Sequence, residues 1–459
     1  MPKKIVLGLV AVITSISMIQ PTQMKANTNN QNLSDLTEEP NPLENVDAPM
    51  YANQFGVSKD EALRRLNLQP IIGKLGEELS QRYQSIYGGL WIEHQPNYSV
   101  NIGVRVDASK DEIDALKSYI SETSGVVNDV AYVQTKFTEA EILRAYNDIQ
   151  VGINAVRGES FGWSSFVDIK NNRVVFETSG GIKNNYGTAE MLSAIHSAAE
   201  KSPIASDLPS DLADVPFKAD AIQHTQVENV SRMQPLWSVI GGKQHNSTVP
   251  SGVANCTLGF AIYWDPDPLN ISKRRITTAG HCPVGSYTSG LSEENVTVQL
   301  IFKGAEYPGS TNRQDMRWDA PASTSDIVTN KIYHGSGTRR ITSMYTWTQV
   351  QTGEYVCKYG RTTGYTCGTI ETKYQDQCSW WDWLTGWCLY SFVRVSTPTK
   401  TTALAKEGDS GGPVFWSGVA YGQVSYADPA WAITGGYHSY AYWPINRLSL
   451  PNLNLLMVP

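Results

Sequence analysis

The cysteines divide this 459-residue chain into two unlike parts. All six lie from position 256 to position 388, and the first 255 residues contain none. An even number of cysteines in an exported chain predicts disulfide bonds, so only the second part is expected to be cross-linked. A chain of this length can build two or three domains, each with its own core. We therefore interpret the sequence as two different domains joined together.

The N-terminus has the features of an export signal. In MPKKIVLGLVAVITSISMIQ, two lysines precede an apolar run that is too short and too early for a membrane-spanning helix. We expect residues 1–26 to be a secretory signal peptide that is cleaved after Ala26. No second long apolar stretch follows, so the mature protein is expected to be extracellular and soluble, without a membrane anchor.

Composition and charge exclude other classes of function. The chain is 41% hydrophobic and 18% charged, which is typical of a globular protein. Its net charge is −7 and it has no basic run, so no nucleic-acid partner is expected. The first part has no His/Cys cluster and no glycine-rich phosphate loop, and we expect neither a metal nor a cofactor.

The first part has a mixed pattern of helices and strands. Helix starts are predicted at Ser58, Ser109 and Thr138, because each is followed three residues later by a Glu that completes a capping box. Strand-like runs lie between these helices, and Asn171-Asn172 separates two of them as a hairpin turn would. The expected segments are a flexible leader at 27–57, an α+β domain at 58–201 and a linker at 202–238.

From Val239 onward the pattern changes. Short strand-like runs separated by glycines dominate, such as TLGFAIYW and VTVQLIFKG, and helical periodicity is nearly absent. We therefore predict an all-β barrel or sandwich over residues 239–459.

The segment EGDSGGPVF places Ser410 among glycines, which permit a positive φ or a close approach of the backbone. Taken alone, it also fits a tight turn between strands. A serine nucleophile needs a base, and histidine is the natural one near neutral pH. Among the histidines at 245, 281, 334 and 438, we select His281, which follows small residues at a strand end in ITTAGHCPVG.

A carboxylate must orient that histidine and stabilise its cation. The segment RQDMRWDA offers Asp315 and Asp319. We prefer Asp315, because the alternating residues after it suit a strand that leaves the site. Asp319 and Asp326 remain alternatives.

The order His281, Asp315, Ser410, with the motifs TAGHC and GDSGGP, resembles the chymotrypsin-fold serine endopeptidases. VCKYGRTTGYTCGTI, ANCTLGFAIYW and WPINRLSL resemble segments of the bacterial α-lytic protease and streptogrisin group, and YGGLWIEH and SSFVDIKNNRVVFE resemble its long propeptide. The resemblance covers most of residues 58–459. It implies an all-β catalytic domain of two six-stranded barrels with the active site in the cleft between them, preceded by an α+β propeptide.

The resemblance also implies roles for single residues. The N–H groups of Gly408 and Ser410 would form the oxyanion hole, and a buried Asp409 would position the turn. The implied disulfides are Cys256–Cys282, Cys357–Cys367 and Cys378–Cys388. The chain departs from the group before GDSGGP, where the usual cysteine is missing and a Trp-rich loop at 378–388 takes its place. The substrate pocket would be lined by residues 435–437 and by Glu407, Val424, Ser425, Tyr426 and Ala427.

Three pocket positions predict specificity. Leu404 stands near the place where trypsin-like enzymes carry an acid, and Val424 where glutamate-specific relatives are expected to carry histidine. Ala427 takes a place often held by glycine. We expect a preference for uncharged, small-to-medium apolar side chains before the cleaved bond.

Together these features predict a secreted, monomeric serine endopeptidase that acts on polypeptides at neutral to alkaline pH. It would be made as a proenzyme, with residues 27–238 as a folding aid and inhibitor that self-cleavage removes near Val239. The alternative is a catalytically inactive binding protein that uses the Trp-rich loop.

Overall fold

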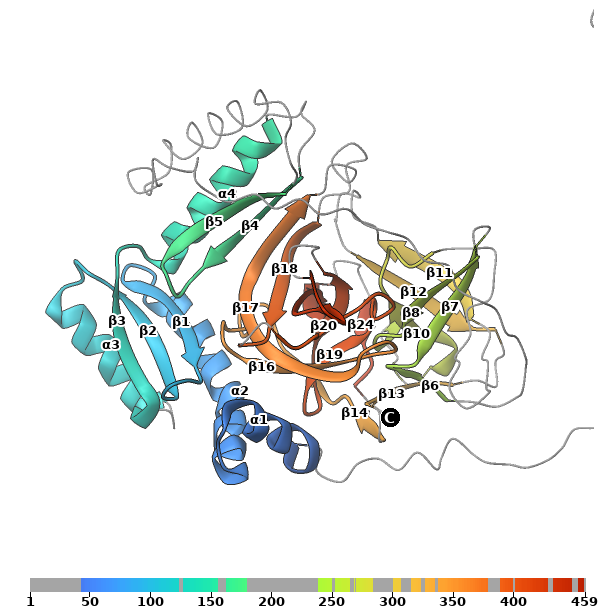
Figure 1. The fold of residues 1–459 in the computed structure, drawn as a ribbon. Coiled ribbons are helices and arrows are strands. Elements are labelled where there is room, and N and C mark those ends of the chain that lie inside the picture. The colour runs from blue at the N-terminus through green and yellow to red at the C-terminus, as the bar shows by residue number, and fades with distance from the viewer. Residues whose placement is uncertain are drawn as a thin grey trace, which may run out of the picture. The chain divides into compact units, whose positions relative to one another are not determined.

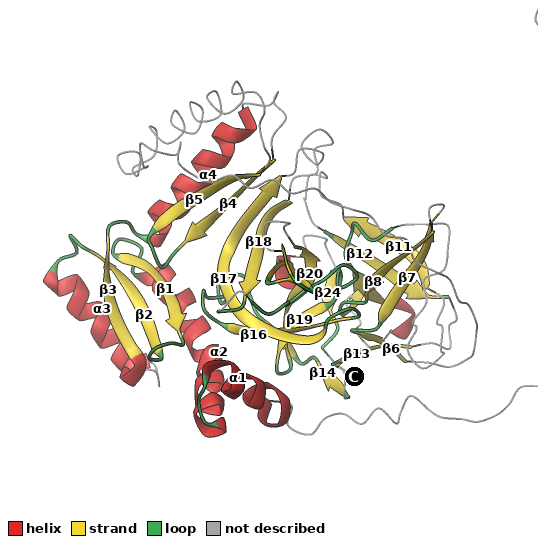
Figure 2. Cartoon of the chain, viewed as in Figure 1, coloured by secondary structure: helices red, strands yellow, loops and turns green. Residues whose placement is uncertain are grey.

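The computed structural model describes most of the chain from Leu43 onward (Figures 1 and 2). The described residues are 43–123, 127–155, 162–179, 238–249, 252–264, 268, 270–283, 300–306, 315–322, 327–334, 337–378, 389–398, 401–427, 432–447 and 453–457. The expected signal peptide, most of the linker, Asp326, Cys388 and nearly all of the Trp-rich loop lie outside them. Within the described residues, no helix is long and apolar enough to cross a membrane.

The N-terminal region is α+β, as predicted. Capping boxes form at two helix starts: Ser109 and Glu112 exchange backbone-to-side-chain hydrogen bonds of 3.0 and 3.3 Å, and Thr138 and Glu141 do so at 2.8 and 3.2 Å. The elements are α1 (Ala48–Phe55), α2 (Lys59–Arg82), β1 (Tyr87–Glu93), β2 (Ser99–Arg105), α3 (Lys110–Thr123), β3 (Val130–Thr135), α4 (Glu139–Ala155), β4 (Gly162–Asp168) and β5 (Arg173–Ser179).

The strands of this region form a three-stranded sheet and a separate hairpin. Strands β1, β2 and β3 make one sheet in that order, with β1–β2 antiparallel and β2–β3 parallel. Apolar side chains of α2 and α3, such as Leu79 and Leu116, are buried against it. Strands β4 and β5 form the hairpin predicted from Asn171-Asn172, with Asp168 paired to Arg173.

Part of the segment expected to be a flexible leader is helical. Leu43–Asp47 forms a helical turn that continues into α1. The side chains of Tyr51 and Phe55 are buried, and their core partners, such as Tyr355, lie about 300 residues later in the chain. The expected leader boundary at residue 57 is therefore wrong at its C-terminal end, because a short helix can be ordered by a distant core that its own sequence does not reveal.

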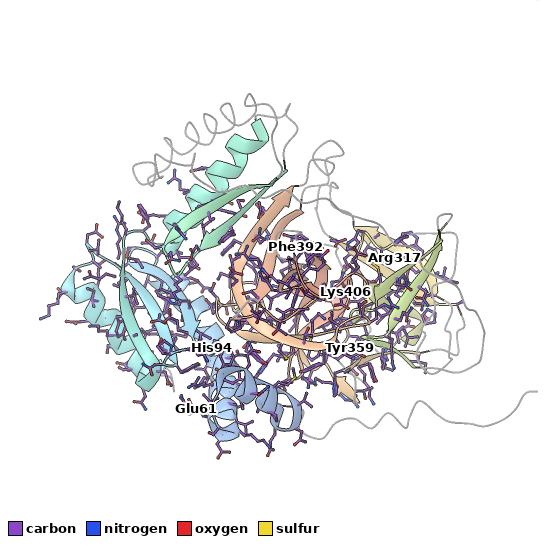
Figure 3. All side chains as sticks on the ribbon, in the orientation of Figure 1. Glu61, His94, Arg317, Tyr359, Phe392 and Lys406 are labelled. Carbon is purple, nitrogen blue, oxygen red and sulfur yellow. A yellow bond between two sulfur atoms is a disulfide. The ribbon has the colours of Figure 1, made fainter. Side chains whose placement is uncertain are left out.

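The C-terminal region is all-β, as predicted, and part of it is a closed six-stranded ring. The strands follow the order β16, β19, β20, β23, β18 and β17, and β17 pairs again with β16. Side chains such as Phe392 are buried within this region (Figure 3). The ring consists of β16 (Tyr355–Gly360), β17 (Gly364–Cys378), β18 (Leu389–Ser396), β19 (Pro413–Trp416), β20 (Val419–Tyr426) and β23 (Ser439–Pro444).

The other half of the C-terminal region is built from smaller sheets. Its main sheet has the order β11-β12-β10-β9-β24, a second has β14-β13-β6, and β7 and β8 form a hairpin. The bounds are β6 (Ser238–Gly241), β7 (Gln244–Val249), β8 (Gly252–Thr257), β9 (Ala261–Trp264), β10 (Arg274–Thr278), β11 (Leu300–Glu306), β12 (Met316–Pro321), β13 (Ile327–Tyr333), β14 (Thr338–Arg340) and β24 (Leu453–Leu455). Short strands β15 (Ser343–Met344), β21 (Ala432–Ile433) and β22 (Gly436–Tyr437) complete the region.

The N-terminal region contacts the C-terminal region through backbone pairing with the ring and a buried ion pair with β14. Strand β4 extends the sheet by pairing antiparallel with residues 375–378 of β17. Asp47 and Arg339, both nearly without exposed surface, form an ion pair with Nη1 and Oδ2 3.1 Å apart. Tyr365 also donates its hydroxyl hydrogen to Asp47. Burying two charges costs desolvation energy, and the mutual attraction of the pair together with additional hydrogen bonds offsets that cost.

Helix α2 approaches the segment before β16 closely. Gln69 exchanges hydrogen bonds with both backbone groups of Tyr355, at 2.5 and 3.1 Å. A Cβ on Gly73 would lie 2.6 Å from the carbonyl oxygen of Gln349 and 3.3 Å from Oε1 of Glu354. The helix therefore covers the fully buried carboxyl group of Glu354, and burial raises the pKa of Glu354 well above its usual range.

We predict that Glu354→Gln stabilises the protein more and more as pH rises above the ordinary pKa of a glutamate. Because the folded-state pKa of Glu354 is raised, wild type loses stability as pH rises above the ordinary pKa of about 4.3. At pH 8 the variant should gain at least about 1 kcal/mol in the free energy of unfolding, given about 1.4 kcal/mol per pKa unit. Urea unfolding of the full chain carrying Ser410→Ala would measure this at pH 4.5 and pH 8.

The matched control is Glu44→Gln, because Glu44 lies on the surface, with a side chain 46% exposed, and pairs with Lys59. It should change little at either pH. An equal gain for Glu354→Gln at both pH values would show that ionisation of Glu354 is not the cause.

Candidate active site

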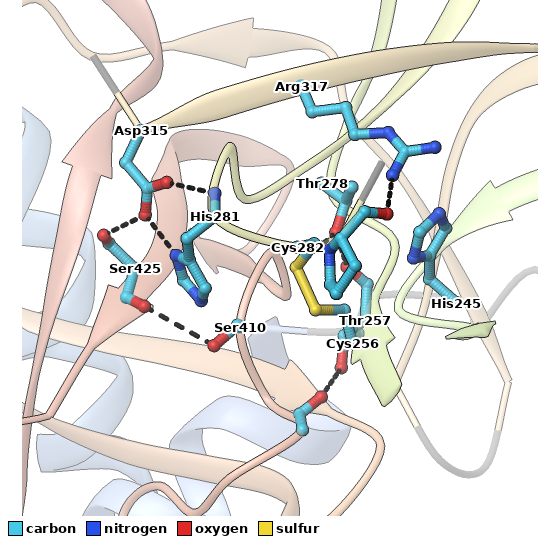
Figure 4. The surroundings of a disulfide bond; sticks show 12 residues. His245, Cys256, Thr257, Thr278, His281, Cys282, Asp315, Arg317, Ser410 and Ser425 are labelled. Atoms are coloured by element: carbon cyan, nitrogen blue, oxygen red, sulfur yellow. Dashed lines mark hydrogen bonds and ion pairs between the residues drawn. A yellow bond between two sulfur atoms is a disulfide. The ribbon is translucent and has the colours of Figure 1, made fainter. Parts of the chain in front are cut away.

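The sheet brings His281 and Asp315 together. Strands β10 and β12 are antiparallel neighbours with Thr278 opposite Arg317, so the residues after β10 lie beside those before β12. Asp315 accepts a hydrogen bond from the His281 backbone N–H at 2.8 Å through Oδ1, and its Oδ2 lies 2.9 Å from His281 Nδ1 (Figure 4). The carboxylate therefore fixes both the backbone and the ring of His281, whose side chain is 41% exposed.

The Asp315 carboxylate is buried and charged. Burial alone would raise its pKa, but the neighbouring His281 and hydrogen bonds from His281 and Ser425 hold the pKa of Asp315 below its usual value. An ionised partner on Nδ1 leaves the other ring nitrogen, Nε2, to act as a proton acceptor. The sequence assigned Ser425 to the substrate pocket, whereas its hydroxyl donates to Asp315 Oδ2.

Ser425 also connects the pair to Ser410. The Ser410 hydroxyl donates to the Ser425 carbonyl oxygen at 3.5 Å, so one residue of β20 contacts both Ser410 and Asp315 (Figure 4). The three residues predicted from the motifs are thus joined by a continuous set of contacts, although they lie on three different segments of the chain.

The turn around Ser410 needs its glycines. Gly408 and Gly411 have φ values of +94° and +85°, which L side chains rarely adopt. A Cβ on Gly411 would also lie 2.2 Å from the Thr278 hydroxyl oxygen. Within the described part of the chain, the N–H groups of Gly408 and Ser410 have no acceptor, so both remain available to a ligand.

The buried carboxylate of Asp409 fixes this turn through an ion pair and several hydrogen bonds. The carboxylate lies 3.1 Å from Lys358 Nζ, and both side chains are buried. It also accepts hydrogen bonds from the backbone N–H groups of Thr362, Thr363 and Lys406. Burial would raise its pKa, but the Lys358 charge and these donors keep the pKa of Asp409 below its usual value.

Two buried residues that the sequence did not single out connect the halves of the C-terminal region. Thr257 donates its N–H to the Ser410 carbonyl at 2.8 Å and its hydroxyl hydrogen to the Gly408 carbonyl at 2.7 Å. Gln423 donates to the carbonyl oxygens of Thr278 and Asp315 at 2.8 and 3.1 Å. Threonine after a cysteine and glutamine in a strand are too common for either role to be visible in the sequence.

The disulfides Cys256–Cys282 and Cys357–Cys367 are present. The first connects β8 to the residue after His281. The third expected bond, Cys378–Cys388, lies outside the described residues at Cys388. Of the alternative acids, Asp319 contacts His245 and Arg317 instead of His281.

The remaining predicted pocket residues differ in exposure. Val424 is buried in the same core as Leu404, Tyr426 and Ala427 pack partly buried beside Phe392, and Glu407 is exposed.

Comparison with known proteins places this region in a family. Residues 269–443 match the family model described as Trypsin. Streptogrisin-C from Streptomyces griseus is 28% identical over 176 residues, which cover 38% of this chain and 33% of streptogrisin-C. The chain thus spans about a third of that relative's length.

Solved structures are similar over about half of the chain. Nocardiopsis protease (NAPase) is 25% identical and covers 48% of this chain and 98% of its own, with a TM-score of 0.36. The chymotrypsin of Cellulomonas bogoriensis is 22% identical and covers 48% and 100%, with a TM-score of 0.36.

The family match identifies residues 269–443 as a trypsin-family domain, a serine protease domain of the chymotrypsin fold. The similarity to streptogrisin-C agrees with the bacterial group whose motifs the sequence resembles. The predicted resemblance to chymotrypsin-fold serine proteases is therefore confirmed for residues 269–443.

We predict that Lys358→Met destabilises the protein by about 3–5 kcal/mol, because it leaves the buried Asp409 carboxylate without its cation. Urea unfolding of the full chain carrying Ser410→Ala measures the loss. The double variant Lys358→Met/Asp409→Asn should recover most of it, since no buried charge remains. A double variant as unstable as the sum of its single variants would contradict a coupled pair.

Proposed function

We propose that residues 239–459 hydrolyse peptide bonds, with Ser410 as nucleophile, His281 as general base and acid, and Asp315 as the orienting carboxylate. The observation that carries this proposal is that the Asp315 carboxylate contacts both the backbone N–H and Nδ1 of His281. Ser425 contacts the same carboxylate and Ser410, and these residues lie in the region that matches the trypsin family.

The reaction would proceed in two displacements. The Ser410 oxygen attacks the carbonyl carbon of the scissile bond while His281 Nε2 takes the hydroxyl proton. His281 then gives that proton to the leaving amine, and an acyl-enzyme remains on Ser410. Water repeats the attack, with the proton again passing through His281, and frees Ser410. Because His281 must be neutral to accept the first proton, we expect activity at neutral to alkaline pH.

The available N–H groups of Gly408 and Ser410 support an oxyanion hole. Negative charge develops on the carbonyl oxygen during attack, and donors held in place beforehand stabilise it without reorganisation. Each such donor typically contributes about 10²–10³ in rate. Asp409 and Lys358 would act indirectly, by fixing the turn that presents these donors.

We propose an uncharged, small-to-medium apolar preference before the cleaved bond. The buried Leu404 and Val424 place no charge near the expected pocket, and Tyr426 and Ala427 contribute apolar surface beside Phe392. Glu407 is the one charged residue among those expected to line the pocket, and it is exposed, so a Lys, Arg or Glu side chain buried against the others would lack a charged partner.

A digest of a mixed protein substrate would test this preference. Mass spectrometry should show cleavage mainly after Ala, Val, Leu and similar residues. Cleavage mainly after Lys, Arg or Glu would refute it, and the same digest with Ser410→Ala should yield no such fragments.

We further propose that residues 27–238 act as a folding aid and inhibitor that self-cleavage removes near Val239 after export directed by residues 1–26. The pairing of β4 with β17, the Asp47–Arg339 ion pair and the contacts of α2 support a role for this region in completing the fold. The active form would be a secreted monomer.

The first test is intact mass before and after a serine-reactive phosphonate probe. Wild type should shorten to about the 239–459 fragment and take one probe, because Ser410 is an activated nucleophile. Ser410→Ala should remain long and unlabelled.

A matched control is Ser417→Ala, because Ser417 lies in the turn between β19 and β20 and is not part of the proposed triad. It should process and label like wild type. If wild type takes no probe even after the N-terminal region is removed, Ser410 is not activated, and the binding-protein alternative is favoured.

A further inference from the structure

Strand β12, which directly follows the proposed triad acid, carries two further ionisable side chains. Asp315, Arg317 and Asp319 alternate along the chain, and alternate residues of a strand point to the same side of a sheet. Asp315 contacts His281. Arg317 and Asp319 are both buried, and neither has a part in the mechanism described so far (Figure 3).

Arg317 contacts the turn that contains His281. Its Nε donates to Asp319 Oδ1 at 2.9 Å, and its Nη1 donates to the carbonyl oxygen of Pro283, two residues after His281. The guanidinium also lies 5.3 Å from the centre of the Phe302 ring. A planar guanidinium with several fixed donors can hold a carboxylate and a carbonyl at once.

A buried histidine lies beside this arrangement. His245 Nε2 is 3.3 Å from Asp319 Oδ2, and both side chains are almost fully buried. Burial lowers the pKa of His245, and neither of its ring nitrogens forms a hydrogen bond within the described part of the chain. His245 is paired with Cys256 across the β7–β8 hairpin, which places it beside the disulfide to Cys282.

The turn that carries His281 is therefore fixed at three successive residues. Asp315 holds His281, the disulfide holds Cys282, and Arg317 holds Pro283. A general base must lie within hydrogen-bond reach of the proton it takes, and a displacement of about 1 Å can cost 10²-fold in rate. Loss of one of three anchors would let the backbone of this turn shift.

We infer that Arg317 is a positioning residue for His281, and that Asp319 holds Arg317 in place. The inference rests on the proposed function, because it assigns His281 as the base whose position matters. Arg317 acts through the Pro283 carbonyl and does not touch the reacting atoms.

The test variant is Arg317→Lys. Lysine presents a single ammonium group, which should remain with the charged Asp319 because hydrogen bonds between ions are the stronger ones. The Pro283 carbonyl then loses its donor. We expect kcat to fall about 10- to 100-fold with KM little changed, because the substrate contacts are intact.

The matched control is Arg274→Lys. Arg274 is also buried in this half, and its guanidinium donates to the carbonyl oxygens of Pro268 and Val328, away from the His281 turn. A comparable loss of thermal stability is expected, with kcat unchanged. An equal fall in kcat in both variants would assign Arg317 a structural role only.

A second measurement needs no catalysis. In the full chain carrying Ser410→Ala, the proton shared by His281 Nδ1 and Asp315 can be followed by NMR. Arg317→Lys should speed its exchange with solvent, and Arg274→Lys should not. If Arg317→Lys does not fold, Asp319→Asn, which removes the carboxylate charge that holds Arg317, should give a smaller change in the same direction.

The two proposals fail differently. No labelling of wild-type Ser410 by the phosphonate would refute the proposed function and leave the NMR comparison intact. Normal labelling with unchanged kcat and proton exchange in Arg317→Lys would overturn only the positioning role.

Discussion

A buried carboxylate at the junction of the two halves of the C-terminal region determines the arrangement of the site. Asp315 directly precedes β12 in one half and receives hydrogen bonds from His281 in the same half and from Ser425 in the other. Gln423 donates to its backbone carbonyl from the second half as well. A buried negative charge costs several kcal/mol unless donors surround it, so the two halves must meet in the register that supplies those donors.

The same physical device recurs away from Asp315. Asp409 pairs with Lys358, Asp319 with Arg317 and Asp47 with Arg339, and in each pair both side chains are nearly without exposed surface. Such pairs contribute little net stability compared with apolar packing. An arrangement that leaves one of the two charges buried without its partner is, however, strongly destabilised. Here they join the serine turn to β16 and the N-terminal region to β14, and the pair within β12 holds Arg317 beside the histidine turn. We infer that they set the registry of these contacts.

Local patterns were the most predictable from the sequence. Capping boxes need only residues three apart, and the turn around Ser410 needs only its own glycines, so both could be recognised directly. The contacts of Thr257, Gln423 and Ser425 could not, because their partners lie 15 to 151 residues away and the residue types are ordinary. The choice between Asp315 and Asp319 depended on the register of β12 against β10. Helix α1 was missed for a similar reason, since its core is supplied by residues near Tyr355.

The pairing of β4 with β17 has a consequence for solubility. Residues 375–378 of β17 have β18 on one side and β4 on the other. In the proposed form without the N-terminal region, a row of backbone donors and acceptors would become an open sheet edge, which is the usual template for pairing between chains. Proteins often protect such edges with inward-pointing acidic or basic side chains, and Asp376 is a buried acid at this position. Its carboxylate accepts the N–H of Ser391 at 2.5 Å, and the register of β17 against β18 shifts on both sides of Gln375. An irregular edge that carries an acid would resist the stacking of one copy on the next.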